Sequence, residues 1–155
     1  NPDRVRSCTL IASAGLGPEI DADFITGVVG ANRRKQLKPY LQSLFADPSR
    51  VTRQLIDDLL RFKRVDDVQD ALRRIAQNLV TDGKQVALFR NELESLQTPI
   101  QVIWGEKDQI IPSSHCTDLP DSVSIDLLAD CGHMVHMEAA REVNQLVLSF
   151  LEKTD

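Results

Sequence analysis

Two short stretches in the last third of the chain constrain its fold more than any other feature. Residues 99–112 read PIQVIWGEKDQIIP, in which an apolar run is followed by a glycine and then by Asp108. Residues 131–144 read CGHMVHMEAAREVN, in which His133 precedes an amphipathic segment. A short, mostly apolar segment such as Ile100 to Trp104 is typical of a strand buried in a parallel sheet. Because neighbouring parallel strands end at the same edge of a sheet, we expect Asp108 and His133 to meet there.

Two further segments are predicted to be strands. Residues 8–14 (CTLIASA) form a short apolar run with a β-branched centre, and Gly15, Gly17 and Pro18 end it. That pattern favours a second buried parallel strand, followed by a turn. Residues 123–128 (VSIDLL) alternate apolar and polar side chains at their start, which predicts a third strand near the sheet edge.

The first part of the intervening segment has a helical pattern. Asp21 is a candidate N-cap for a first helix, since a short acidic side chain accepts from free N–H groups. Pro39 is expected to begin a second helix, because proline is favoured in the first turn. Asp47 and Pro48 are expected to cap and begin a third helix, whose apolar stripe runs to Phe62.

The helical pattern continues after Phe62. Apolar residues at helical spacing predict a helix over 68–79 that Gly83 closes. A weaker helix is expected over 86–93, and a closing helix is expected to present Val143, Leu146, Val147, Phe150 and Leu151 to the core.

The predicted elements divide the chain into three parts. Residues 1–20 hold a core strand and turn, residues 21–96 a helical insertion, and residues 97–155 the last two core strands with the acid and histidine loops and the closing helix. Three strands are few for so many helices, and the chain begins Asn1-Pro2 without methionine. We therefore expect a piece of a longer protein, with part of its sheet elsewhere. An uncovered sheet edge is a template for pairing, so we expect a homo-oligomer through that edge.

Composition excludes several classes of protein. The formal net charge is −5, whereas a nucleic-acid surface needs a basic excess. The basic run Arg33, Arg34 and Lys35 is interpreted as lying near a helix C-terminus, where the dipole favours cations. No apolar run approaches the roughly 20 residues that span a membrane. The three cysteines show no paired spacing, which favours free thiols and a cytoplasmic location.

An acid and a histidine in this chain order are two members of an acyl-transfer triad. Asp108 would accept a hydrogen bond from one imidazole nitrogen of His133, and the other nitrogen would take the proton of a nucleophile. The alternative is a solvated turn aspartate and a histidine that only caps a helix. The nucleophile normally occupies G-x-S-x-G, but the glycines are at 15, 17, 27, 30, 83, 105 and 132. The motif is absent, so we expect this chain alone to be inactive.

Other residues could be taken for functional groups, but structural interpretations are preferred. Cys131 lies too close to His133 to reach nucleophile–base geometry and is interpreted as a small buried residue. His133, His136 and Glu138 lack the spacing of a helical zinc site, so no metal is expected. His136 is expected to line the cleft or to lie near the start of the closing helix, and Glu138 is interpreted as an acid in its first turn.

Three smaller motifs are also interpreted as structural and not functional. Ser113 and Ser114 are interpreted as helix caps, Gly15-Leu16-Gly17 as a turn, and Trp104 as a core residue.

The acid motif WGEKDQIIP and the histidine motif CGHMVHME resemble the second half of an α/β-hydrolase. The resemblance implies an α/β fold made of the last three strands of a mostly parallel sheet, with a helical cap inserted over residues 21–96. More narrowly, residues 14–21, 33–49 and 51–68 resemble the α/β-hydrolase-type acyltransferase component of acetoin dehydrogenase complexes, the dihydrolipoamide acetyltransferases.

That resemblance implies a function. A parent protein of this family would transfer an acetyl group from dihydrolipoamide to coenzyme A, together with the other subunits of a dehydrogenase complex. The lipoyl group would belong to another domain, and this piece would bind no cofactor itself. The alternatives are an ester or carbon–carbon-bond hydrolase of the same fold, and a non-catalytic assembly fragment.

Overall fold

The computed structural model describes residues 4–154 of the chain. Asn1, Pro2, Asp3 and Asp155 lie outside the described residues, and the expectation drawn from Asn1-Pro2 falls there. The regular elements, in chain order, are β1 (Cys8–Ile11), α1 (Ala22–Gly30), α2 (Arg34–Ser43), the 3-10 helix η2 (Pro48–Arg50), α3 (Arg53–Phe62), α4 (Val68–Leu79), β2 (Val80–Thr81), β3 (Lys84–Gln85), the 3-10 helix η3 (Asn91–Ser95), β4 (Ile100–Gly105), the 3-10 helix η4 (Ser113–Cys116), β5 (Val123–Leu128), α5 (Val135–Glu138) and α6 (Ala140–Lys153).

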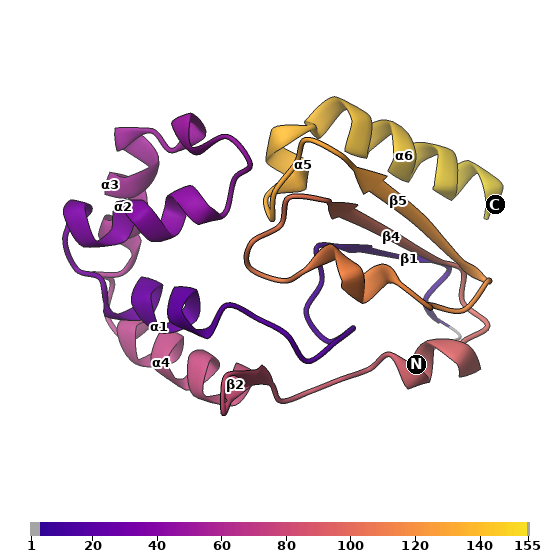
Figure 1. Cartoon of the computed structure of the whole chain (residues 1–155), viewed down its shortest axis with the longest axis horizontal. Coiled ribbons are helices and arrows are strands. Elements are labelled where there is room, and N and C mark those ends of the chain that lie inside the picture. Colours follow the sequence, from indigo (N-terminus) through magenta and orange to yellow (C-terminus); the bar gives the residue numbers. More distant parts are fainter. Residues whose placement is uncertain (1–3, 155) are drawn as a thin grey trace.

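The main sheet is parallel, with the order β1-β4-β5 (Figure 1). Cys8 is opposite Ile100 in the β1–β4 pair, and Ile100 is in turn opposite Val123 in the β4–β5 pair. All three strands therefore end at the same edge. This topology confirms the α/β prediction, although β1 ends at Ile11, before the expected limit at residue 14.

Strand β4 lies at the centre of the sheet and is buried along its whole length. Helix α6 runs across one side of the sheet (Figure 1). There Ile103 packs with Leu128 and Val143. On the other side Val102 and Trp104 pack with Leu16 and with residues that follow β4. The mostly apolar sequence of β4, interrupted only by the buried Gln101, thus reflects burial on both faces, as in other parallel sheets.

Helices α1 to α4 and the short hairpin β2–β3 form a helical block (residues 22–85), which lies beside the sheet in Figure 1. The block has its own apolar centre, in which Leu37 and Leu41 of α2 pack with Ile56 and Leu60 of α3. The predicted cap of α1 is confirmed, because Asp21 Oδ1 accepts from Phe24 N at 2.9 Å.

The limits of two helices differ from the sequence prediction. Helix α2 begins at Arg34 and contains Pro39, because burial of Leu37 and Leu41 on one face outweighs the hydrogen bond that proline lacks. Asp47 and Pro48 begin only the short η2, and Thr52 caps α3 instead.

The remaining predictions in the helical block and at the C-terminus are partly wrong. Phe62 is 53 % exposed and so does not belong to the buried stripe. The helix expected over 86–93 is absent, and the 3-10 helix η3 lies instead at Asn91–Ser95. Gly83 lies in the β2–β3 turn with φ +74°, where a positive φ favours glycine. In α6, Val143 and Phe150 are buried as expected, whereas Leu151 is exposed. Within residues 4–154, no helix has the length and apolar character needed to cross a membrane.

Candidate active site

Asp108 and His133 lie in contact at the shared edge of the parallel strands. Asp108 follows β4 by three residues, and His133 follows β5 by five. His133 Nδ1 is 2.9 Å from Asp108 Oδ2. The two residues are 25 positions apart in sequence, and the parallel β4–β5 pairing brings their loops together. The prediction that Asp108 and His133 lie in contact is confirmed.

The Asp108 carboxylate is fully buried, with 0 % of its side chain exposed. Its Oδ1 accepts hydrogen bonds from the backbone N–H groups of Ile110 at 2.8 Å and Ile111 at 3.0 Å. Its Oδ2 accepts a hydrogen bond from Trp104 Nε1 at 2.9 Å. Several hydrogen bonds to one carboxylate hold it in a single orientation. Asp108 is therefore a fixed acceptor for the imidazole.

The backbone joins the two loops independently of these side chains. Glu106 N donates to Leu128 O at 3.0 Å, and Lys107 N donates to Cys131 O at 2.9 Å. Gly105 makes this close approach possible, since a Cβ there would lie 2.3 Å from the carbonyl oxygens of Cys131 and Gly132. The glycine that ends β4 is thus required by the approach of the histidine loop.

The contact with Asp108 determines which imidazole nitrogen can act as a base. An ionised carboxylate only accepts hydrogen bonds, so we assign the proton of the neutral ring to Nδ1. Nε2 then carries the free lone pair, and it has no hydrogen-bond partner among residues 4–154. The His133 side chain is 22 % exposed. This arrangement can remove a proton from a group placed beside Nε2.

Cys131 and Cys116 do not have the character of reactive nucleophiles. Burial raises the pKa of the Cys131 thiol, and the nearby Glu138 and Glu142 carboxylates raise it further. Burial also raises the pKa of Cys116 to about 11. Both groups are therefore thiols near neutral pH, whereas reactive cysteines have a lowered pKa. The prediction that Cys131 is a small buried residue is confirmed.

Other sequence interpretations near the site are only partly correct. His136 is exposed in α5, directly before α6 begins at Ala140, so its predicted place near the start of the closing helix is confirmed. Glu138 ends α5 rather than beginning the closing helix. Ser113 and Ser114 lie inside η4 and cap no helix. In the described part of the chain, no group of three or more His, Cys, Asp and Glu side chains could hold a metal ion.

The basic run also lies elsewhere than expected. Arg34 is the first residue of α2, so the run is at the start of a helix and not at its end. Arg34 forms an ion pair with Asp57 of α3, and this guanidinium lowers the pKa of the Asp57 carboxyl. The pair joins two helices of the block, which compensates for the unfavourable position of a cation at a helix N-terminus.

Sequence reasoning missed a buried histidine on the far side of Trp104. His115 is 4 % exposed, and its Nε2 lies 2.8 Å from Glu19 Oε2. Its ring meets the Trp104 ring edge-on, with centroids 6.2 Å apart. The hydrogen bond from His115 lowers the pKa of the Glu19 carboxyl. Nothing in the local pattern of SSHC marks this residue, because its partner is 96 positions away.

Comparisons with known proteins show the family of this chain. The family described as alpha/beta hydrolase fold matches residues 1–140. The chain is 47 % identical over 154 residues to the dihydrolipoyllysine-residue acetyltransferase component of the acetoin cleaving system of Pseudomonas putida, covering 98 % of this chain and 40 % of that protein. The corresponding component of Cupriavidus necator is 39 % identical over 150 residues, with 97 % and 40 % covered. The chain thus spans about 40 % of the length of these curated relatives.

Solved structures show the same fold. A meta-cleavage product hydrolase from Pseudomonas fluorescens superposes with a TM-score of 0.82 at 20 % identity, covering 98 % of this chain and 57 % of that one. A 2-hydroxy-6-oxo-6-phenylhexa-2,4-dienoate hydrolase from Rhodococcus gives 0.81 at 16 % identity, covering 97 % and 57 %. The family match and the parallel sheet together show that this chain belongs to the α/β-hydrolase fold family.

Proposed function

We propose that this chain is the acid-and-histidine part of an α/β-hydrolase-type acyltransferase, with Asp108 as the orienting acid and His133 as the general base. The observation that carries the proposal is the 2.9 Å contact between His133 Nδ1 and the buried Asp108 Oδ2. The hydrogen bonds to Asp108 hold the carboxylate, and the carboxylate in turn orients the ring and stabilises its protonated form.

The nucleophile would come from a segment outside these 155 residues. In the reaction, that nucleophile attacks the carbonyl carbon of a thioester while His133 Nε2 takes its proton. The proton then passes to the departing thiol as the carbon–sulfur bond breaks. In the second half, Nε2 takes the proton of the acceptor thiol as that thiol attacks the acyl carbon. Nε2 then returns the proton to the nucleophile as the acyl–nucleophile bond breaks.

We assign acetyl-dihydrolipoamide as the donor and coenzyme A as the acceptor, in an acetoin-cleaving complex. The support is the 47 % identity to a protein that is named for acetyl transfer in such a system. The lipoyl group would be attached to another part of the longer protein, and this chain would supply the proton transfer. Its partners would be the other components of that system, in the cytoplasm.

The test uses the longer protein that contains this chain, assayed with acetyl-dihydrolipoamide and coenzyme A. His133→Ala and Asp108→Asn are each expected to lower kcat by about 10³-fold or more, as losses in such triads do. The 155-residue chain alone is expected to show no turnover. Wild-type activity in both variants would reject the assignment.

A hydrolase acting on an ester or a carbon–carbon bond is the second candidate within enzymes. Its support is the fold shared with the meta-cleavage product hydrolase and the sequence similarity to human monoacylglycerol lipase ABHD6, 26 % identity over 170 residues. The two candidates differ in the acceptor, thiol or water. Hydrolysis of short aryl esters without transfer to coenzyme A would favour the hydrolase and reject the acyltransferase.

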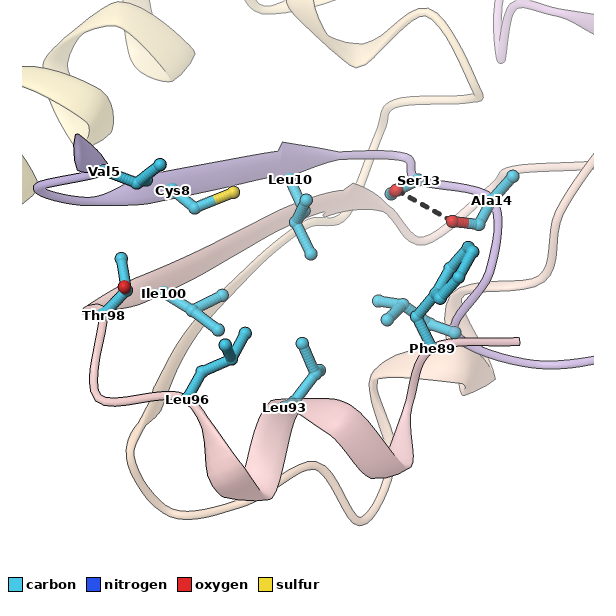
Figure 2. Close-up of a pocket in the computed structure, with 11 residues that line it drawn as sticks. Val5, Cys8, Leu10, Ser13, Ala14, Phe89, Leu93, Leu96, Thr98 and Ile100 are labelled. Carbon is cyan, nitrogen blue, oxygen red and sulfur yellow. Dashed lines mark hydrogen bonds between the residues drawn. The ribbon is translucent and has the colours of Figure 1, made fainter. Parts of the chain in front are cut away.

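The outer edge of the sheet at β1 could allow copies of the chain to associate. In the described residues β1 pairs only with β4, so its other edge is open. A cavity of about 540 Å³ lies beside it, with Leu10 of β1 facing Leu93 of η3 and Leu96, which directly follows η3 (Figure 2). Phe89, at one end of this groove, is 56 % exposed. We propose that the isolated chain covers this edge and groove with a second copy.

Light scattering after size exclusion tests that association. The wild-type chain is expected to be a dimer or larger, and Phe89→Asp is expected to shift it towards monomer. Leu148→Asp is the matched control, because Leu148 is 59 % exposed on α6 and does not line the groove. A monodisperse wild-type monomer, or an equal effect of both variants, would contradict the proposal.

A further inference from the structure

The carboxylate of Glu138 joins the histidine loop to the helical block. Its Oε1 accepts a hydrogen bond from Ala46 N at 2.8 Å, just after α2 ends. Its Oε2 accepts a hydrogen bond from Gly132 N at 2.7 Å, directly before His133. Ala46 and Glu138 are 92 positions apart. The side chain of Glu138 therefore links, by hydrogen bonds, two backbone segments that are far apart in the chain.

Neighbouring contacts make the junction continuous. Met134 N donates to Leu44 O at 3.0 Å, so the residues on both sides of His133 are tied to the end of α2. The Arg50 guanidinium donates to Met137 O and Glu138 O, each at 3.2 Å. These bonds hold the backbone of α5, and with it the Glu138 side chain, against the block.

The fit between the two segments is close. A Cβ at Gly132 would lie 2.7 Å from Ala46 N and 2.9 Å from the carbonyl carbon of Phe45. Backbone atoms of the histidine loop and of the helical block are thus in direct contact, which leaves no room for water between them at Gly132. The N–H groups of Gly132 and Ala46, both in part-buried hydrogen bonds, are paired by this carboxylate, and leaving such donors unpaired would cost stability.

We propose that Glu138 is a positioning residue for His133, and that it couples the position of the general base to that of the helical block. Asp108 holds the imidazole ring, whereas Glu138 holds the backbone from which the ring projects. A displacement of the block would then move His133 relative to Asp108. This proposal deepens the proposed function and rests on it for its catalytic consequence.

Amide hydrogen exchange on the 155-residue chain tests the positioning without any activity. In Glu138→Gln the side-chain amide replaces one acceptor by a donor, so one of the two bonds must be lost. We expect exchange at Gly132 or Ala46 to accelerate roughly ten- to a hundredfold, as for a lost charge-assisted bond. Glu142→Gln is the matched control, since Glu142 is exposed in the first turn of α6. Unchanged exchange in Glu138→Gln, or equal acceleration in the control, would overturn the proposal.

Kinetics of the longer protein test the coupling. Glu138→Ala is expected to lower kcat about tenfold or more with a smaller change in KM, because misplacement of the base affects the chemical step. Glu138→Gln, which keeps one bond, is expected to recover part of that loss. Equal kcat in Glu138→Ala and wild type would overturn the coupling. His133→Ala is measured alongside: if it retains activity, the proposed function fails, and the exchange result still decides whether Glu138 holds the loop.

Discussion

Trp104 Nε1 donates a hydrogen bond to the Asp108 oxygen that His133 also contacts, at 2.9 Å in each case. The indole is fully buried in the sheet core. It therefore connects the packing of β4 directly to the acid of the candidate site. The interpretation of Trp104 as a core residue is confirmed. Its indole N–H also donates a hydrogen bond to the carboxylate of Asp108.

Replacement of Trp104 tests the value of that hydrogen bond. Trp104→Phe keeps an aromatic ring but leaves Asp108 Oδ2 and Ile111 O without the indole donor. We expect the free energy of unfolding to fall by about 2–4 kcal/mol, from the lost bonds and the reduced volume. Urea denaturation followed by circular dichroism measures it. A loss no larger than that of the buried conservative change Ile103→Val, about 1 kcal/mol, would contradict this role.

The close approach at Gly105 gives a second prediction. In Gly105→Ala the new methyl group would meet the carbonyl oxygens of Cys131 and Gly132 at 2.3 Å, and backbone atoms cannot turn away as a side chain can. We expect a loss of about 2–3 kcal/mol and a shift of the His133 ring resonances in NMR spectra.

Gly30→Ala is the matched control, since nothing lies within 4 Å of a Cβ at that position in α1. We expect it to leave stability unchanged or to raise it by about 0.5 kcal/mol. Similar losses in both variants would show that the contact at Gly105 is not the cause.

Lys63 gives a prediction for the helical block. Its ammonium group donates to the carbonyls of Val28, Val29 and Ala31 at the end of α1, and it is 5 % exposed. Burial lowers the pKa of Lys63. Lys63→Met should cost about 2–4 kcal/mol of stability, because the methionine cannot bond these carbonyls. The exposed Lys38→Met serves as the control in the same urea titration, and an equally small effect of both would contradict the prediction.

The buried thiol of Cys116 should make the free energy of unfolding depend on pH. Burial raises the pKa of its thiol from 9.0 to about 11, so between these values the unfolded chain loses the proton and the folded chain keeps it. Stability should therefore fall with rising pH in this window, by at most about 1.4 kcal/mol per pH unit. Cys116→Ala should remove this component. Parallel stability curves for wild type and variant from pH 8 to 11 would show that the thiol makes no such contribution.

The regular part of the fold and the central pair of the site could be inferred from local patterns. The apolar run in β4, the glycine after it and the order of acid and histidine are local features, and the direction of parallel strands then brings Asp108 and His133 together. The cap at Asp21 is likewise a local hydrogen bond, three residues long. The helix limits near Pro39 were wrong because the burial of Leu37 and Leu41 prevailed over a local preference.

The contacts that complete the site depend on tertiary structure alone. Glu138 reaches Ala46 across 92 positions, and His115 reaches Glu19 across 96. Neither glutamate differs in its local sequence from an ordinary surface acid. Such pairs form only when separate elements have packed, since the cost of bringing distant segments together is met by the burial of the whole core and not by the pair itself. Amino-acid pattern was enough to find the acid and the histidine, whereas the packing of the helical block against the sheet decided how they are held.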